Sequence, residues 1–127
     1  MAFTSPTGPL SFEASTGLTS NQFVRLTTNA ILANPTAGDH ILGVLVSSGT
    51  TGSTVTGDWH SVQVMGVAKV RCATGSTGIS ANTLVVTSSK GRAAPTTAGD
   101  FYVGLALEDV SSTKSVISVL LNPYGST

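Results

Sequence analysis

The chain has 127 residues, enough for one domain with a single core and too few for two comfortable ones. Charged residues make up only 9% of it, against roughly 25% in an ordinary soluble domain, and six basic side chains balance six acidic ones. Because neither sign clusters, the sequence carries no footprint for nucleic acid or an anionic membrane, and we expect neither as a partner. Polarity comes instead from 19 Thr and 17 Ser, which favours a protein that works inside an assembly.

The single cysteine, Cys72, has no partner for an internal disulfide, whereas small secreted scaffolds usually carry several. The first twenty residues contain no Lys or Arg and no continuous apolar run, so we expect no secretory signal and synthesis in a cytoplasm. The longest apolar stretches, such as 41–46, are far shorter than the roughly 18 residues of a membrane helix.

The N-terminal segment 1–20 is rich in proline and glycine, and we interpret it as an extended arm before a single β domain at 21–127. Its large apolar side chains Phe3, Leu10 and Phe12 need cover from water. One interpretation makes LSFEA (10–14) an edge strand of the chain's own sheet. In the other, the arm orders on binding and lays these side chains across a partner or a neighbouring subunit.

The rest of the chain is predicted to be all-β. Its apolar segments are rich in β-branched residues and bounded by turn residues, and no window sustains a helical period. The short, regular spacing favours a compact antiparallel barrel or sandwich. The predicted strands are 23–28, 40–47, 61–73, 83–88, 101–108 and 115–121.

An internal repeat organises these strands. AGDHILGVLVSS (37–48) returns 61 positions later as AGDFYVGLALED (98–109). Each copy follows an apolar strand, a polar turn, a small-residue strand and Pro-Thr, and each precedes a further alternating strand. The connection at 47–59 in the first copy is longer than its counterpart. We therefore predict two similar strand-corner-hairpin units, at about 23–66 and 84–121, that face each other and bury one core.

The repeated glycines have separate predicted roles. Gly38 and Gly99 can adopt positive φ at the corner, and the aspartate that follows each can accept a nearby backbone N–H. Gly43 and Gly104 lie inside strands, where a glycine marks a bend or the close approach of another backbone. The alternative for these glycines is a loop that cradles a ligand.

Motifs for chemistry are absent from the sequence. Neither a phosphate-binding loop nor G-x-G-x-x-G occurs, and with 17 serines a Ser-His-Asp set could be chosen arbitrarily. We expect no enzymatic activity, no cofactor and no small-molecule substrate.

The sequence indicates no metal site, because the pairs Asp39-His40 and Asp58-x-His60 do not have a spacing recognised for metal ligands. Cys72 lies in an alternating strand and is most simply a small buried hydrophobe. Trp59, the only tryptophan, could cap the core or anchor a partner; the core is the favoured interpretation.

Residues 62–123 resemble the small phage capsid cement, or head decoration, proteins. The matching elements are a G-x-A-x-V strand, an entry to a second strand, an s-x-x-G-r-a turn, a v-G-x-A-l-e strand and a closing v-x-V-x-l strand. In this sequence they fall at 66–70, 81–85, 89–93, 103–108 and 116–121. The long loop 47–59 and the first 21 residues have no dependable counterpart in that pattern.

The resemblance implies a β-tulip-like all-β fold without enzymatic activity. It also implies a homotrimer on the outer surface of an icosahedral head, where it stabilises the shell by bridging major capsid proteins. The expected contact residues, for the capsid or for a neighbouring subunit, are Phe3, Leu10, Phe12 and Trp59. The alternatives are a phage tail-tube or fibre subunit and a carbohydrate-binding β-sandwich. The latter normally presents aromatic platforms, whereas aromatic residues make up 6% of this chain and are scattered.

Overall fold

The computed structural model of the chain describes residues 10–15, 17–46, 53–73, 79–96, 99–111 and 115–122. These residues form ten strands and no helix, as predicted, so that no membrane-spanning helix occurs among them. The strands are β1 (Leu10–Ala14), β2 (Phe23–Leu26), β3 (Ile31–Ala33), β4 (Gly43–Leu45), β5 (Trp59–Gln63), β6 (Val67–Arg71), β7 (Leu84–Thr87), β8 (Ala93–Pro95), β9 (Gly104–Ala106) and β10 (Val116–Leu121).

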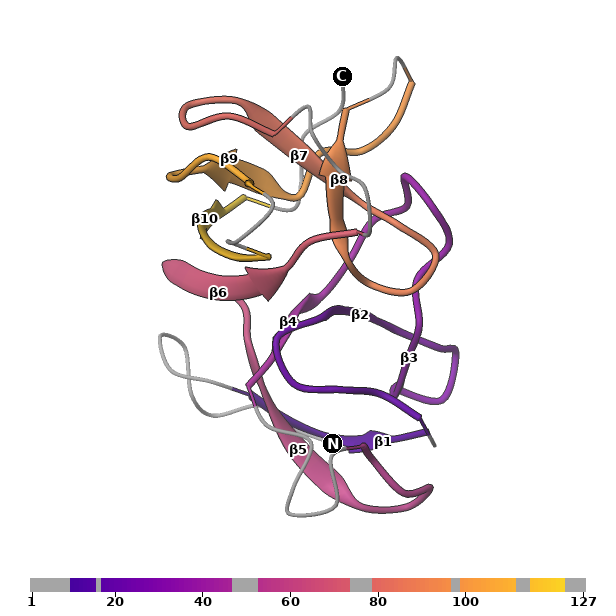
Figure 1. Cartoon of the computed structure of the whole chain (residues 1–127). Coiled ribbons are helices and arrows are strands. Elements are labelled where there is room, and N and C mark those ends of the chain that lie inside the picture. The colour runs from indigo at the N-terminus through magenta and orange to yellow at the C-terminus, as the bar shows by residue number, and fades with distance from the viewer. Residues whose placement is uncertain are drawn as a thin grey trace.

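The first five strands close into a barrel in the order β1-β3-β2-β4-β5 (Figure 1). β1 closes it by pairing with β3 in parallel and with β5 antiparallel. The interpretation of LSFEA as a strand of the chain's own sheet is therefore confirmed, although the strand is paired on both sides and is not an edge. Of the predicted arm, residues 1–9 and 16 lie outside the described residues, and 10–14 belong to the barrel.

The second five strands repeat this topology in the order β6-β10-β9-β7-β8, with a parallel bridge from Cys72 to Ala93 linking the two ends of the sheet. Each strand occupies the position of the strand five earlier in the chain. The register is repeated as well: Val24 lies opposite Gly43, and Val85 lies opposite Gly104, each 61 residues later. The predicted repeat is confirmed. Its unit is larger than expected, because a leading strand, β1 or β6, belongs to each copy.

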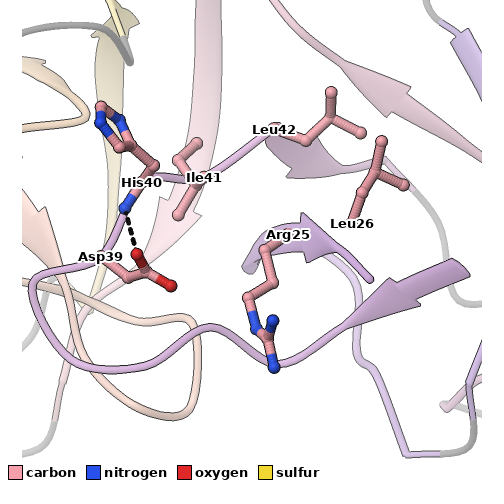
Figure 2. Close-up of a pocket in the computed structure, with 6 residues that line it drawn as sticks. All are labelled: Arg25, Leu26, Asp39, His40, Ile41 and Leu42. Carbon is pink, nitrogen blue, oxygen red and sulfur yellow. Dashed lines mark hydrogen bonds between the residues drawn. The ribbon is translucent and has the colours of Figure 1, made fainter. Parts of the chain in front are cut away.

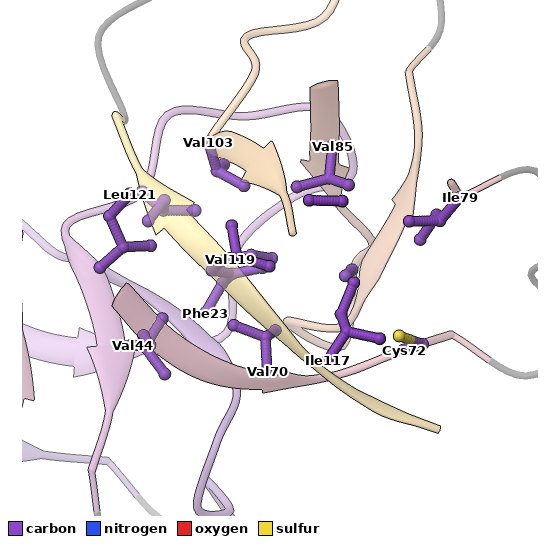
Figure 3. Packing of buried hydrophobic residues seen from close by; sticks show 14 residues of the cluster. Phe23, Val44, Val70, Cys72, Ile79, Val85, Val103, Ile117, Val119 and Leu121 are labelled. Carbon is purple, nitrogen blue, oxygen red and sulfur yellow. The ribbon is translucent and has the colours of Figure 1, made fainter. Parts of the chain in front are cut away.

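The described residues form two hydrophobic clusters, whereas the repeat predicted one core. The cluster of the first barrel consists of buried side chains from β1 to β5 and the β1–β2 connection, among them Phe12, Leu32 and Leu45. The other contains the inward side chains of the second sheet together with Phe23, Ile41 and Val44 of the first unit (Figure 3). Each unit thus encloses its own apolar interior, and the first unit also contributes side chains to the interior of the second.

The predicted strand 61–73 is two strands, β5 and β6, separated by a turn at residues 64–66. Gly66 has a φ of 82° there, and the side-chain amide of Gln63 donates to the carbonyls of Met65 and Val67 at 3.0 and 2.7 Å. The turn lets the chain leave the first barrel and begin the second. The predicted strands 40–47 and 101–108 are also shorter, at 43–45 and 104–106. Just before them, the Leu42 N–H donates to the Val24 carbonyl and the Val103 N–H to the Val85 carbonyl, both at 2.8 Å.

The two Ala-Gly-Asp corners have the predicted positive φ and also contact each other. Gly38 and Gly99 have φ values of 71° and 92°, and the Asp39 carboxylate accepts the His40 N–H at 2.8 Å. The backbone N–H of Phe101 donates to the Gly38 carbonyl at 3.0 Å, and the Phe101 ring stacks on His40 with centroids 3.7 Å apart. His40 and Phe101 occupy the same position in the two copies, so the corners help to join the units.

Gly43 and Gly104 are sites of close packing, as the sequence predicts. A Cβ atom on Gly43 would meet a backbone carbonyl of β5 and lie 2.9 Å from Val62 Cγ1. On Gly104 it would meet a backbone carbonyl of β10 and lie 2.8 Å from Val119 Cγ1. Neither glycine has a positive φ, so the requirement is the space taken by the adjacent strand and not backbone conformation.

Candidate binding surfaces

The predicted contact residues of the N-terminal segment are separated by the fold. Phe3 lies outside the described residues, and Leu10 is half-buried against the first-barrel cluster. Phe12 is only 2% exposed and belongs to that cluster. Its place in the contact set is therefore corrected: β1 is paired on both sides, and its alternation turns Phe12 into the barrel interior.

Trp59 lies on the surface at the start of β5, opposite Glu13 of β1, and is 52% exposed. The favoured interpretation, in which Trp59 caps the core, is wrong, because β5 points His60 and Val62 to the other side. A tight turn, closed by the Asp58 N–H and the Val55 carbonyl at 3.1 Å, places the exposed Val55 just before it. Trp59 and Val55 form an exposed apolar pair at this turn.

A second apolar surface lies on the outer face of the second sheet and was not among the predicted contacts. Val67, Leu120, Leu105 and Leu84 are paired in succession across β6, β10, β9 and β7. We call these four residues the apolar row. The alternation of VISVLL predicts that Leu120 and Leu121 point to opposite sides, but only the strand pairing shows that Leu120 aligns with three more apolar residues.

The charged groups beside the apolar row are paired with each other. Lys69 Nζ lies 3.7 Å from Glu108 Oε2, and the same carboxylate oxygen accepts the Ser118 N–H at 2.7 Å. An exposed ion pair contributes little to folding. The pair of Lys69 and Glu108 carries no net charge.

A polar depression lies at the first corner, lined by Arg25, Leu26, Asp39, His40, Ile41 and Leu42 (Figure 2). Its polar groups hold the local chain: Arg25 Nε donates to the Asn34 carbonyl at 2.9 Å, and Asp39 accepts the His40 N–H. Among the described residues, no three His, Cys, Asp or Glu side chains gather as a metal site would require. This depression is therefore a structural feature of the corner.

Cys72 is buried at the end of β6, as its place in an alternating segment predicts. Burial raises the pKa of its thiol above the ordinary value of 9.0, because an apolar interior disfavours the thiolate. The group is thus held in its unreactive, protonated form at neutral pH.

Comparisons with known proteins agree with this architecture. The family model of the phage cement protein matches residues 4–121. No curated protein matches the chain. Among solved structures, the chain is similar to the N base of the head fibre gp8.5 in bacteriophage phi29, with a TM-score of 0.69 over 94% of this chain and 97% of that chain. The sequence identity is 14%, so this likeness supports the fold alone.

Proposed function

Because the chain belongs to the phage cement protein family, we propose that it binds the outer surface of an icosahedral phage head and stabilises the shell by bridging neighbouring major capsid proteins. The family match over residues 4–121 is the observation that carries this proposal. It identifies a structural component of the virion. Attachment to the outer surface and the bridging of major capsid proteins go beyond the family match and are our proposal.

The composition of the chain favours attachment to the shell through a large neutral contact surface more than through charged groups. With 9% charged residues, its contacts are neutral, so salt has few ion pairs to screen. A contact of roughly 800 Å² on each subunit is a standard size for a specific interface. Linking several subunits in one oligomer then multiplies a modest affinity through effective concentration.

We assign Trp59 and Val55 to the contact with the shell. They are 52% and 54% exposed at the same turn of the first barrel. A tryptophan is the residue most enriched among those that dominate binding energy when a partner buries them. Among the expected contact residues that the structure describes, Trp59 is the most exposed. We further propose that the subunits associate as homotrimers.

Binding to purified heads that lack the protein tests the proposal. We expect the chain to co-sediment with heads and to raise the temperature at which they open, with little change between low and high salt. Trp59→Ala should weaken binding about tenfold or more, whereas Trp59→Phe should retain part of it. Lys90→Ala, at an exposed turn of the second unit, is the control and should bind like the wild type. A chain that stays in the supernatant, or that binds without stabilising heads, contradicts the proposal.

The head-fibre likeness favours one second candidate, the base of a head fibre. The solved structure with the same fold is described as such a base, and the chain covers nearly all of it. Electron microscopy of decorated heads distinguishes the two roles. A cement protein gives density at repeated positions between capsomers, whereas a fibre base gives density only beneath projecting fibres.

A further inference from the structure

The apolar row runs straight across four neighbouring strands of the second sheet. Val67, Leu120 and Leu84 are 52%, 43% and 39% exposed. Leu105 lies between Leu120 and Leu84 in the pairing and is half-buried by them. Four aligned branched side chains in water form a contiguous patch, which is the arrangement that marks an interaction surface.

Two of the four corresponding positions in the first unit are already used for packing. Phe23 and Val44 correspond to Leu84 and Leu105, 61 residues earlier, with the same pairing to each other. Both are buried, and both belong to the cluster that fills the second unit. These two positions thus belong to a part of the repeated unit that packs against another unit. In the second copy, no described segment covers the row fully, and Leu84 remains 39% exposed.

The charges around the apolar row indicate the chemistry of its partner. The row itself carries no charge, and the nearby Lys69 is paired with Glu108 within the subunit. A groove along the row is lined by Leu84, Leu105 and Leu120 together with Tyr102, Gly104, Leu121 and Asn122. A matching surface must therefore be apolar and neutral, because an unpaired charge buried against it would be costly.

We propose that the apolar row is covered by a second copy of this chain, with the rows of neighbouring copies meeting around the symmetry axis of the oligomer. Every copy carries the same neutral, apolar surface, and closed symmetry brings identical surfaces together. Outer sheet faces can approach to about 10 Å with their side chains interdigitated. The inference rests on the self-association in the proposed function, and it names the surface responsible.

Leu120→Glu tests the interface at its centre. Leu120 is 43% exposed in the subunit, so the change is compatible with folding, but it buries like charges where the rows meet. We expect the wild type to be oligomeric by light scattering and the variant to dissociate about 100-fold or more readily, with an unchanged circular dichroism spectrum. Ser61→Glu adds the same charge to the exposed face of β5, the counterpart of β10, and should leave the oligomer intact.

A crosslinking variant keeps the test independent of added charge. Leu120→Cys should form a covalent dimer of subunits under mild oxidation, whereas Ser61→Cys should not. The native Cys72 is buried and does not contribute a link in the folded protein.

The outcomes separate this inference from the proposed function. A wild-type oligomer that survives Leu120→Glu and gives no Leu120→Cys crosslink overturns the interface while leaving head binding intact. A wild-type chain that is monomeric in solution, and loses head binding on Leu120→Glu, assigns the row to the shell and overturns the contact between copies. A row-dependent oligomer that does not bind heads supports the interface and contradicts the cement function.

Discussion

Replacement of Phe23 by Ala is the sharpest test of how the two units are joined. Phe23 starts β2 of the first barrel, yet its fully buried ring belongs to the cluster of the second unit. The backbone around it crosses between the units: the Phe23 N–H donates to the Gly91 carbonyl at 2.7 Å, and the Arg71 N–H donates to the Asn21 carbonyl at 2.9 Å.

The second unit depends on this ring because its own interior side chains are smaller. Strand pairing aligns the inward residues of the two units, and three large ones in the first barrel correspond to small ones in the second. The corresponding pairs are Phe12 and Val70, Leu32 and Ala93, and Leu45 and Ala106. We infer that Phe23 supplies the volume that the second unit lacks.

A buried Phe→Ala change costs about 3–5 kcal/mol through lost transfer energy and the cavity left behind. A chain of 127 residues has a total stability of roughly 6–19 kcal/mol at typical values per residue. We therefore expect Phe23→Ala to remove about a sixth of the stability or more and to lower Tm by about 10–25 °C. Phe23→Leu, which introduces the residue found at the equivalent position of the second unit, should lower the free energy of unfolding by about 1–1.5 kcal/mol.

Leu84→Ala is the matched control, since Leu84 has the same place in the second unit but is 39% exposed. It should cost less than about 1 kcal/mol. Urea unfolding followed by circular dichroism and by Trp59 fluorescence measures both, at a dilution where association does not contribute. Equal losses for the two variants, or a loss below about 1 kcal/mol for Phe23→Ala, would refute the idea that this ring completes the second core.

Three further changes probe individual features. Gly104→Ala should lower the free energy of unfolding by about 3 kcal/mol, because the added Cβ would meet a backbone carbonyl of β10. Gly99→Ala should lower it by only about 1 kcal/mol, since the space around Gly99 is open and only its positive φ is strained. Thermal unfolding of the two variants checks this order. Because burial raises the pKa of Cys72 in the folded state, the contribution of Cys72 to stability should be constant below the unfolded value of about 9.0 and fall as pH rises above it. Cys72→Ala should abolish this part of the loss in urea titrations. Glu108→Gln should lower the free energy of unfolding by about 1 kcal/mol, because it weakens the charge-assisted hydrogen bond from the Ser118 N–H of β10. Lys69→Ala should lower it by less than about 0.5 kcal/mol. Equal losses in urea unfolding would show that the ion pair dominates.

The repeat and its local geometry are determined by the sequence itself. The 61-residue spacing aligns β2 with β7 and β4 with β9, so matching glycines, turns and alternating residues produce the same register twice. The positive φ at Gly38 and Gly99 and the close packing at Gly43 and Gly104 follow from having no side chain at these positions. Burial of Cys72 follows from the two-residue period of its strand.

The tertiary structure alone decides what covers each outward side chain. Phe23 and Leu84 hold equivalent positions on equivalent strands, but Phe23 is enclosed whereas Leu84 is 39% exposed, because among the described residues only Phe23 has another unit beside it. Trp59, at the start of β5, likewise remains 52% exposed among the described residues. Strand alternation specifies the face of the sheet on which a side chain lies. The segment that packs against this face comes from elsewhere in the chain or from another chain, and the local sequence pattern carries no information about that segment.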